Sequence, residues 1–233
     1  MKSLQYRSYQ KELLDRDDIP FRDIQENMRE LNIINTLLGG HAITLKGFQK
    51  LAAGQQQIIV CEIGCGGGDN LAAIAKWCKK KHLPVKFIGL DLKEECINVA
   101  REVGILRSDS EWIVSDYAEV IFEQKPDIIF SSLFCHHFNE PQLVEQLQWM
   151  KNNSNIGFFI NDLHRNMIAY YAIRVLTGLF SSSYLVKHDA PLSVARGFRR
   201  QEWDALFKRA MPKQPVIRWL WAFRYLIIYK NES

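Results

Sequence analysis

The stretch from Ile58 to Asn70 constrains the fold of this chain more than any other. A short apolar run rich in β-branched residues ends in the loop Gly64-Cys-Gly-Gly-Gly68, and a helical pattern begins at Asp69. Glycines permit positive backbone φ angles and a close approach of the main chain to a ligand. The helix that follows offers unpaired N–H groups at its first turn. The stretch therefore predicts a strand, a ligand-binding turn and a helix.

The same alternation of apolar runs and amphipathic segments continues along the chain. The expected strands are residues 57–63, 85–90, 111–114, 127–133 and 156–160, and the expected helices are residues 69–81, 93–103, 141–150, 165–180 and 201–210. Strands that are apolar throughout are typical of a parallel sheet that helices cover on both faces. We therefore expect an α/β protein with a doubly wound sheet.

The two ends of the chain have different periodicities. Residues 4–53 are predicted to be helical, because apolar residues recur at spacings of three and four until Gly39-Gly40 ends the pattern. Residues 216–230 alternate with a period of two, which predicts a terminal strand or strand pair. Residues 187–198 are expected to form a loop before the last helix.

Composition places the chain among ordinary globular proteins and weakens several classes of partner. The 233 residues are 47% hydrophobic and 24% charged, which suits one domain with a sizeable core. The net charge of +4 divides into −3 over the first 160 residues and +7 over the rest. A nucleic-acid partner would require a strong basic stripe and a pI above about 9, whereas the pI here is about 8.7. We expect no nucleic-acid partner.

The cysteines and the hydropathy pattern bear on location. Five cysteines lie in apolar segments, with no Cys-x-x-Cys pair and no Cys/His zinc spacing, so the sequence predicts no metal site. The first 20 residues do not look like a signal peptide, and no apolar run reaches the roughly 18 residues that a membrane span needs. A cytoplasmic protein is the expectation.

The glycine loop fits some ligands better than others. A dinucleotide fingerprint, G-x-G-x-x-G/A, that starts at Gly64 would place Asp69 at its last glycine position, and no phosphate-loop lysine follows the glycines. Glu62 instead places a carboxylate two residues before the first glycine. The loop therefore favours a ligand with a positive charge over a pyrophosphate.

Four motifs in order resemble the class I S-adenosylmethionine-dependent methyltransferases. Glu62-x-Gly64-x-Gly66-x-Gly68 resembles their motif I, and residues 88–91 resemble the strand that ends in an acid for the ribose hydroxyls. Residues 115–117 resemble the loop that binds the adenine amino group, and residues 126–138 resemble the fourth strand and the loop beside the methyl group. The matched core spans about residues 57–161.

This resemblance implies a mostly parallel, seven-stranded, Rossmann-like sheet and S-adenosylmethionine as the cofactor. It implies cofactor binding by Glu62, Gly64, Cys65, Gly66, Asp91, Leu92, Asp116, Tyr117 and Ser132. Two of these acids have other readings, since Asp91 could be a helix N-cap and Asp116 a turn residue. A single domain, 1–233, is expected, with an N-terminal helical cap (1–55), a cofactor-binding core (56–162) and acceptor-side helices and strands (163–233).

The acceptor side is less determined. His136 and His164 are candidate general bases because a neutral imidazole can take a proton near pH 7. For the pair His136 and His137, one packed ring and one surface ring is the favoured alternative, and for His164 a helix start that bonds to the backbone accounts for it equally. The candidate acceptor-pocket residues are His137, Tyr170, His188 and Arg196. The segment 167–180 is apolar nearly all round, so with the N-terminal helices it is interpreted as a wall of an acceptor chamber.

A looser resemblance suggests the acceptor. Leu37-Leu-Gly-Gly-His41 and residues 161–198 resemble small bacterial methyltransferases that act on phenolic, quinone-like or polyketide-type acceptors. Signature loops of adenine-amino and cytosine-C5 methylation are absent from the sequence. The alternatives are a non-catalytic S-adenosylmethionine-binding protein and an RNA or protein methyltransferase, while Asp69 disfavours a nicotinamide dehydrogenase. Peripheral contact of the basic C-terminal third with a membrane or carrier, and a monomer or homodimer, complete the expectations.

Overall fold

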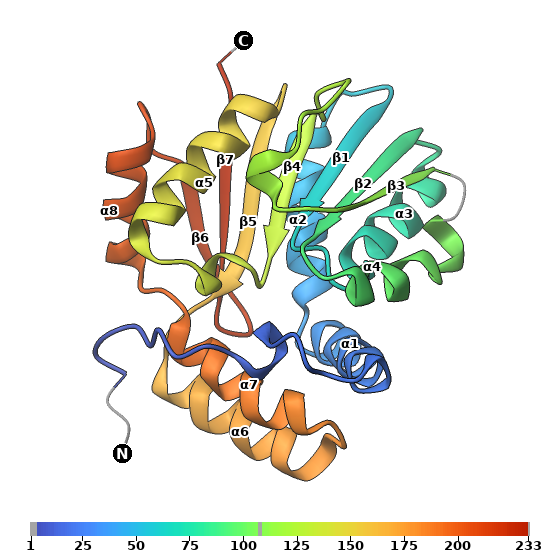
Figure 1. Ribbon diagram of the computed structural model, residues 1–233. Coiled ribbons are helices and arrows are strands. Elements are labelled where there is room, and N and C mark those ends of the chain that lie inside the picture. Colours follow the sequence, from blue (N-terminus) through green and yellow to red (C-terminus); the bar gives the residue numbers. More distant parts are fainter. Residues whose placement is uncertain (1–3, 107–108, 233) are drawn as a thin grey trace.

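The computed structural model describes residues 4–106 and 109–232, and within them the chain forms one seven-stranded sheet (Figure 1). The strands are β1 (Ile58–Ile63), β2 (Val85–Asp91), β3 (Ser110–Val114), β4 (Ile128–Ser132), β5 (Gly157–Leu163), β6 (Val216–Leu220) and β7 (Arg224–Lys230). Their order is β3-β2-β1-β4-β5-β7-β6, and β7 runs antiparallel to both neighbours while the other pairs are parallel. The expected Rossmann-like, mostly parallel sheet is confirmed.

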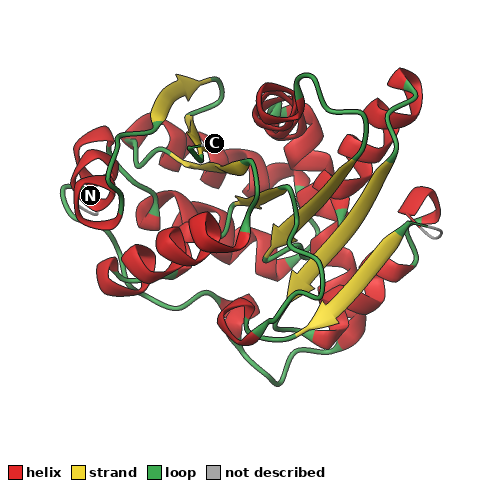
Figure 2. Ribbon diagram, turned by 90° about the horizontal axis from the view of Figure 1, so that it is seen from above, coloured by secondary structure: helices red, strands yellow, loops and turns green. Residues whose placement is uncertain are grey.

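Helices cover both faces of this sheet (Figure 2). They are α1 (Phe21–Leu37), α2 (Gly40–Ala52), α3 (Asp69–Lys81), α4 (Glu94–Arg101), α5 (Glu140–Asn153), α6 (Met167–Phe180), α7 (Tyr184–Arg196) and α8 (Arg200–Ala210), with short 3-10 turns η1 (Leu13–Asp15), η2 (Gly104–Leu106), η3 (Tyr117–Glu119) and η4 (Cys135–His137). Alternate strand residues enter two cores. Ile129 and Phe158 pack with α5 and α8, and Phe130 and Phe159 pack with α2 and α3.

The strand pattern of the sequence is confirmed to within three residues at each boundary, and α3 has the predicted bounds. The period-two segment is an antiparallel pair, β6 and β7, joined by a turn at residues 221–223. In this pair Ile217, Tyr225 and Ile227 face the core, whereas Trp219 is half exposed. The period-two pattern of the sequence therefore identifies the residues that face this core, but it does not locate the turn between β6 and β7.

Two expectations at the ends of the fold are wrong. Residues 4–20, named the N-terminal strap here, are extended except for η1 rather than helical, because their backbone bonds to distant elements, as when the N–H of Leu13 donates to Asp189. The first helical residue is Phe21, directly after Pro20. Residues 187–198 are not a loop, since most of them lie in α7. Pro191 is accommodated inside α7, whose residues Leu185 and Val194 are buried, so tertiary packing overrides the local propensity.

The strap, α1, α6 and α7 lie across the carboxyl ends of the parallel strands (Figure 1). Leu4 packs with Ala169, Tyr170 and Val194, which joins the start of the strap to α6 and α7. Helix α6 is apolar nearly all round but is buried on one side only, since Ile168, Leu179 and Phe180 are exposed. None of the helices among residues 4–106 and 109–232 has both the length and the apolar character to cross a membrane.

Candidate functional site

The ends of four adjacent strands bring the predicted cofactor residues to one edge of the sheet. Glu62 and the glycine loop follow β1, Asp91 ends β2, Asp116 follows β3, and Ser132 ends β4. These strands are neighbours in the order β3-β2-β1-β4, and the direction of winding changes between β1 and β4. Ligands of open α/β sheets bind at the carboxyl edge beside such a switch point.

The glycine loop has the backbone geometry that the sequence suggested. Gly64, Gly66 and Gly68 have φ angles of +66°, +50° and +74°, where a side chain is disfavoured. A Cβ built on Gly64 would lie 2.2 Å from the ring of Phe134, so this glycine also permits close packing. Met28 of α1 lies over the loop, with its Sδ 3.2 Å from a Cβ built on Gly66. Helix α1 therefore covers this part of the edge.

Glu62 is a buried carboxylate with an unused acceptor. Its Oε1 accepts a 3.1 Å hydrogen bond from Asn70 Nδ2, while Oε2 is buried without a partner among the described residues. Burial, reinforced by nearby Asp69, raises the pKa of Glu62 well above its ordinary value. A cationic group at this position would favour the ionised form and satisfy Oε2.

Asp91 is held in place by the main chain. Its Oδ2 accepts from the N–H of Gly66 and its Oδ1 from the N–H of Lys93, each at 2.9 Å. Burial raises the pKa of Asp91, and these backbone hydrogen bonds oppose the rise. The N-cap of α4 is Lys93, so the N-cap reading of Asp91 is wrong. Each carboxylate oxygen keeps a lone pair for a ligand hydroxyl.

The third acid has a structural partner as well. Asp116 is exposed, and its Oδ1 accepts from the N–H of Ala118 at 3.0 Å as the N-cap of η3, while its cofactor role stays a prediction. Tyr117 is partly buried edge-on against Phe134 and Trp149, and burial raises its pKa to about 12. These contacts keep the phenol neutral and its ring in a fixed orientation beside the edge.

The remaining cofactor candidates differ in exposure. Leu92 is 72% exposed next to Asp91, which leaves an apolar side chain available to a flat ligand. Cys65 is buried, so only its main chain can face a ligand. Ser132 is buried and its Oγ accepts from Asn161 Nδ2 at 3.3 Å. After it, Leu133 has a φ of +55°, a conformation that costs a residue with a Cβ about 1–2 kcal/mol. Such outliers cluster at functional sites.

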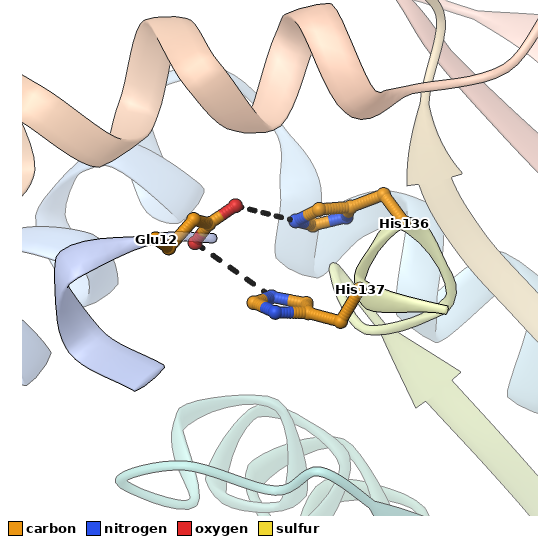
Figure 3. Close-up of side chains that lie close together, drawn as sticks. All are labelled: Glu12, His136 and His137. Carbon is orange, nitrogen blue, oxygen red and sulfur yellow. Dashed lines mark ion pairs between the residues drawn. The ribbon is translucent and has the colours of Figure 1, made fainter. Parts of the chain in front are cut away.

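His136 is clamped between two carboxylates (Figure 3). Its ring Nδ1 lies 2.9 Å from Asp162 Oδ1, and its ring Nε2 lies 3.4 Å from Glu12 Oε1. The backbone N–H of His136 also donates to Asp162 Oδ2. Burial lowers the pKa of His136, but the two carboxylates outweigh it and raise the pKa to about 9. A ring that is protonated at neutral pH does not accept a proton, so this arrangement argues against a general base.

The second candidate base lies elsewhere. His164 is half-buried beyond β5, where Trp219 Nε1 donates to its Nδ1 at 3.1 Å and Tyr225 packs against its ring. Burial, with a contribution from Arg165, lowers the pKa of His164, so its ring is neutral at pH 7. Its contacts are with β6 and β7, on the far side of β5 from the glycine loop. Its role as a base stays a prediction.

The four acceptor-pocket candidates divide into two groups. Tyr170 and His188 line a cavity of about 420 Å³ between α6 and α7. Arg196 is buried outside it and donates from Nε to the carbonyl of His136 at 3.0 Å, and from Nη1 to the carbonyl of Gln10. His137 faces the strap, with its Nδ1 3.3 Å from Asp15 Oδ1. The cavity is lined by Gln10, Tyr170, Tyr171, Arg174, Lys187, His188, Pro191, Leu192 and Ala195.

Several polar residues at this edge were not found by sequence reasoning. Asp69, directly after the glycines, lies 2.8 Å from His41 Nε2 and accepts from Asn35 Nδ2. The sequence gives only a weak indication of Asp162, which is an acidic residue at the end of an apolar strand. Glu12 gives no signal, because nothing in the sequence connects it to residues more than 120 positions away.

Comparison with known proteins agrees with this geometry. Residues 60–155 match a family model described as a methyltransferase domain. No curated protein sequence matches the chain. Among solved structures, the plantazolicin methyltransferase BpumL in complex with SAH is 22% identical, with a TM-score of 0.62 over 87% of this chain and 74% of that chain.

Two further structures extend the likeness. An O-methyltransferase family 2 protein from Planctomyces limnophilus, in complex with apigenin, is 17% identical with a TM-score of 0.60, over 93% of this chain and 63% of that chain. A SAM-dependent methyltransferase from Aquifex aeolicus is 14% identical with a TM-score of 0.60, over 88% of this chain and 97% of that chain. At such identities the likeness establishes the fold. The family match shows that residues 60–155 are similar to a methyltransferase domain, and the solved structures show that the chain shares their fold.

Proposed function

We propose that the protein transfers a methyl group from S-adenosylmethionine to a small, largely apolar acceptor of the phenolic, quinone-like or polyketide type. The observation that carries the acceptor class is the cavity between α6 and α7. Tyr170, Tyr171 and Leu192 give it flat and apolar walls, and Arg174 and Lys187 add positive charge. Small-molecule sites combine apolar lining with a few polar groups that fix orientation.

The carboxyl edge fits the cofactor. The unpartnered Oε2 of Glu62 is an acceptor for an ammonium group, and the backbone-anchored carboxylate of Asp91 suits vicinal hydroxyls. Asp116 and Leu92 are the exposed polar and apolar groups for a purine. When bound, the cofactor supplies an electrophilic methyl group on a sulfonium. The chain's own residues hold and orient the reactants, and α1 shields the edge from water.

A chain of contacts links the cavity to this edge. Gln10 lines the cavity, and its carbonyl accepts from Arg196, which in turn donates to the carbonyl of His136 in η4. Since η4 follows β4, this chain of contacts supports an approach of the acceptor to the edge from the cap side. The basic lining supports an acceptor with an acidic oxygen, which methylation would neutralise.

Two measurements test the proposal. Calorimetric titration with S-adenosylhomocysteine is expected to show one saturable site per chain, and a panel of phenols and quinols is expected to yield a product that has gained one methyl group in mass spectrometry. Saturable binding of NAD without binding of S-adenosylhomocysteine would contradict the cofactor assignment. Cofactor binding without turnover on any acceptor would favour the binding-protein alternative, and strongly salt-dependent RNA binding would favour an RNA substrate.

Charge reversal tests the acceptor cavity separately. Lys187→Glu is expected to raise KM for an acidic phenol while leaving S-adenosylhomocysteine affinity unchanged, because Lys187 lies in the cavity lining. Lys208→Glu is the matched control, since Lys208 is exposed on α8 outside that lining. Equal KM values for the two variants would remove the cavity from the proposal.

A further inference from the structure

Three side chains from two distant parts of the sequence converge where the strap meets η4 (Figure 3). The Nε2 atom of His136 lies 3.4 Å from Glu12 Oε1, and the Nε2 atom of His137 lies 3.7 Å from Glu12 Oε2. The potential ligand atoms of these residues all lie within 4.8 Å of one another. Ligands bound tetrahedrally at about 2.0–2.1 Å from zinc are about 3.4 Å apart. A shift of about an ångström would therefore place all three around one ion.

Both imidazole rings are oriented as metal-binding histidines are. Nδ1 of His136 lies 2.9 Å from Asp162 Oδ1, and Nδ1 of His137 lies 3.3 Å from Asp15 Oδ1. Metal-ligating histidines almost always direct the other ring nitrogen to a carboxylate, carbonyl or water, which fixes the tautomer and the ring. Here that pairing leaves Nε2 of each ring directed at the same carboxylate, that of Glu12. A simple salt bridge does not require two rings in this arrangement.

The charges around the three residues suit a dication. Glu12, Asp15 and Asp162 are three carboxylates. Arg196 Nη1 lies 3.9 Å from Glu12 and 3.7 Å from Asp15, and the Arg7 guanidinium donates to the carbonyls of His136 and Phe138. Ser193 Oγ adds a 2.8 Å hydrogen bond to Glu12. With neutral rings these groups sum to −1. A divalent ion bound between the two Nε2 atoms would face this net negative charge.

We propose that Glu12, His136 and His137 bind one divalent first-row transition-metal ion, for which zinc is the reference. Two imidazole nitrogens and one carboxylate oxygen suit such ions, whereas magnesium and calcium prefer oxygen ligands. Three protein ligands leave a fourth position of a tetrahedral ion open. The sequence predicted no metal because an adjacent His-His pair and a glutamate more than 120 residues away form no recognised spacing. The ion would fasten the strap to η4.

Metal binding is tested on the full chain after dialysis against a chelator, by calorimetry with ZnCl₂ and by the visible spectrum of CoCl₂. One ion per chain, no competition by an excess of magnesium, and a raised thermal midpoint with zinc are expected. His137→Ala and Glu12→Gln should each weaken zinc binding at least tenfold. His137 is partly exposed, so its alanine variant keeps the buried His136–Asp162 pair.

The control variant is His82→Asn, which removes an exposed imidazole at the end of α3 and should leave zinc affinity unchanged. Titration with S-adenosylhomocysteine reports the cofactor site independently, so failure of the metal proposal and failure of the methyltransfer proposal are distinguishable. Absence of saturable zinc binding to the wild-type chain, or zinc binding that survives both ligand variants, would overturn the metal site.

Discussion

Replacing Gly64 by alanine tests whether the glycine loop is held by its packing as well as by its backbone angles. The left-handed conformation at φ +66° costs an alanine about 1–2 kcal/mol. The new Cβ would also lie 2.2 Å from Phe134, and overpacking of this kind costs about 1–3 kcal/mol. We therefore expect Gly64→Ala to lower the free energy of unfolding by about 2–5 kcal/mol.

Two other glycines separate these contributions. Gly54 has a φ of +84°, and a Cβ added there would have no atom within 4 Å, so Gly54→Ala should cost only the conformational part, about 1–2 kcal/mol. Gly178 lies in α6 with open space around it, so Gly178→Ala should stabilise the chain by about 0.5–1 kcal/mol. Urea unfolding followed by tryptophan fluorescence gives all three values. Equal losses for Gly64→Ala and Gly54→Ala would refute the packing argument.

Three further substitutions test the site and its support. Asp91→Asn is expected to weaken S-adenosylhomocysteine binding about 10- to 100-fold in calorimetry, because hydrogen bonds to a charged group are worth about 1.5–3 kcal/mol; unchanged affinity would contradict the ribose assignment. Burial raises the folded-state pKa of Glu62, so the stability of the unliganded chain should fall as pH rises above about 4.5. Glu62→Gln should then be more stable than wild type at pH 8 and equal near pH 4 in urea titrations, and a constant difference would contradict this. Arg165→Lys should cost about 2–3 kcal/mol of unfolding free energy, since Arg165 bridges both oxygens of Glu202 at 2.6 and 3.0 Å; Arg200→Lys, at an exposed pair, should be nearly neutral.

The sheet could be predicted from the sequence because its signals are local. Each parallel strand is a short apolar run, and the cofactor candidates stand at or near the carboxyl ends of these runs, as Glu62 and Asp91 do. Because parallel strands end at the same edge of a sheet, the fold brings these strand ends together, and no long-range contact needs to be predicted. The same reasoning applies to Ser132 at the end of β4, which is why the strand ends that carry these candidates lie along one edge of the sheet.

The cap could not be predicted in the same way because its structure depends on distant contacts. The strap is extended because it is bonded to other elements, as when the N–H of Ser8 donates to the carbonyl of Ala195. Pro191 reads as a helix breaker in sequence, yet it is buried in α7. His136 reads as a candidate base, and only the placement of Asp162 and Glu12 around it reveals a charged cluster.

The strap also has a consequence for the order in which the chain assembles. Its partners lie far along the chain: Arg7 donates to the carbonyl of Arg196, 189 positions later, and Arg165 donates to the carbonyl of Leu4. Contacts across such separations form late, because the long intervening loop must close first. The strap is thus among the last segments to dock, and it docks onto the edge where the reaction is proposed to occur. Hydrogen exchange should find that the strap amides open before those of β1 and β4. Undocking of the strap would then reverse the last step of folding and be the first step by which a ligand reaches the site.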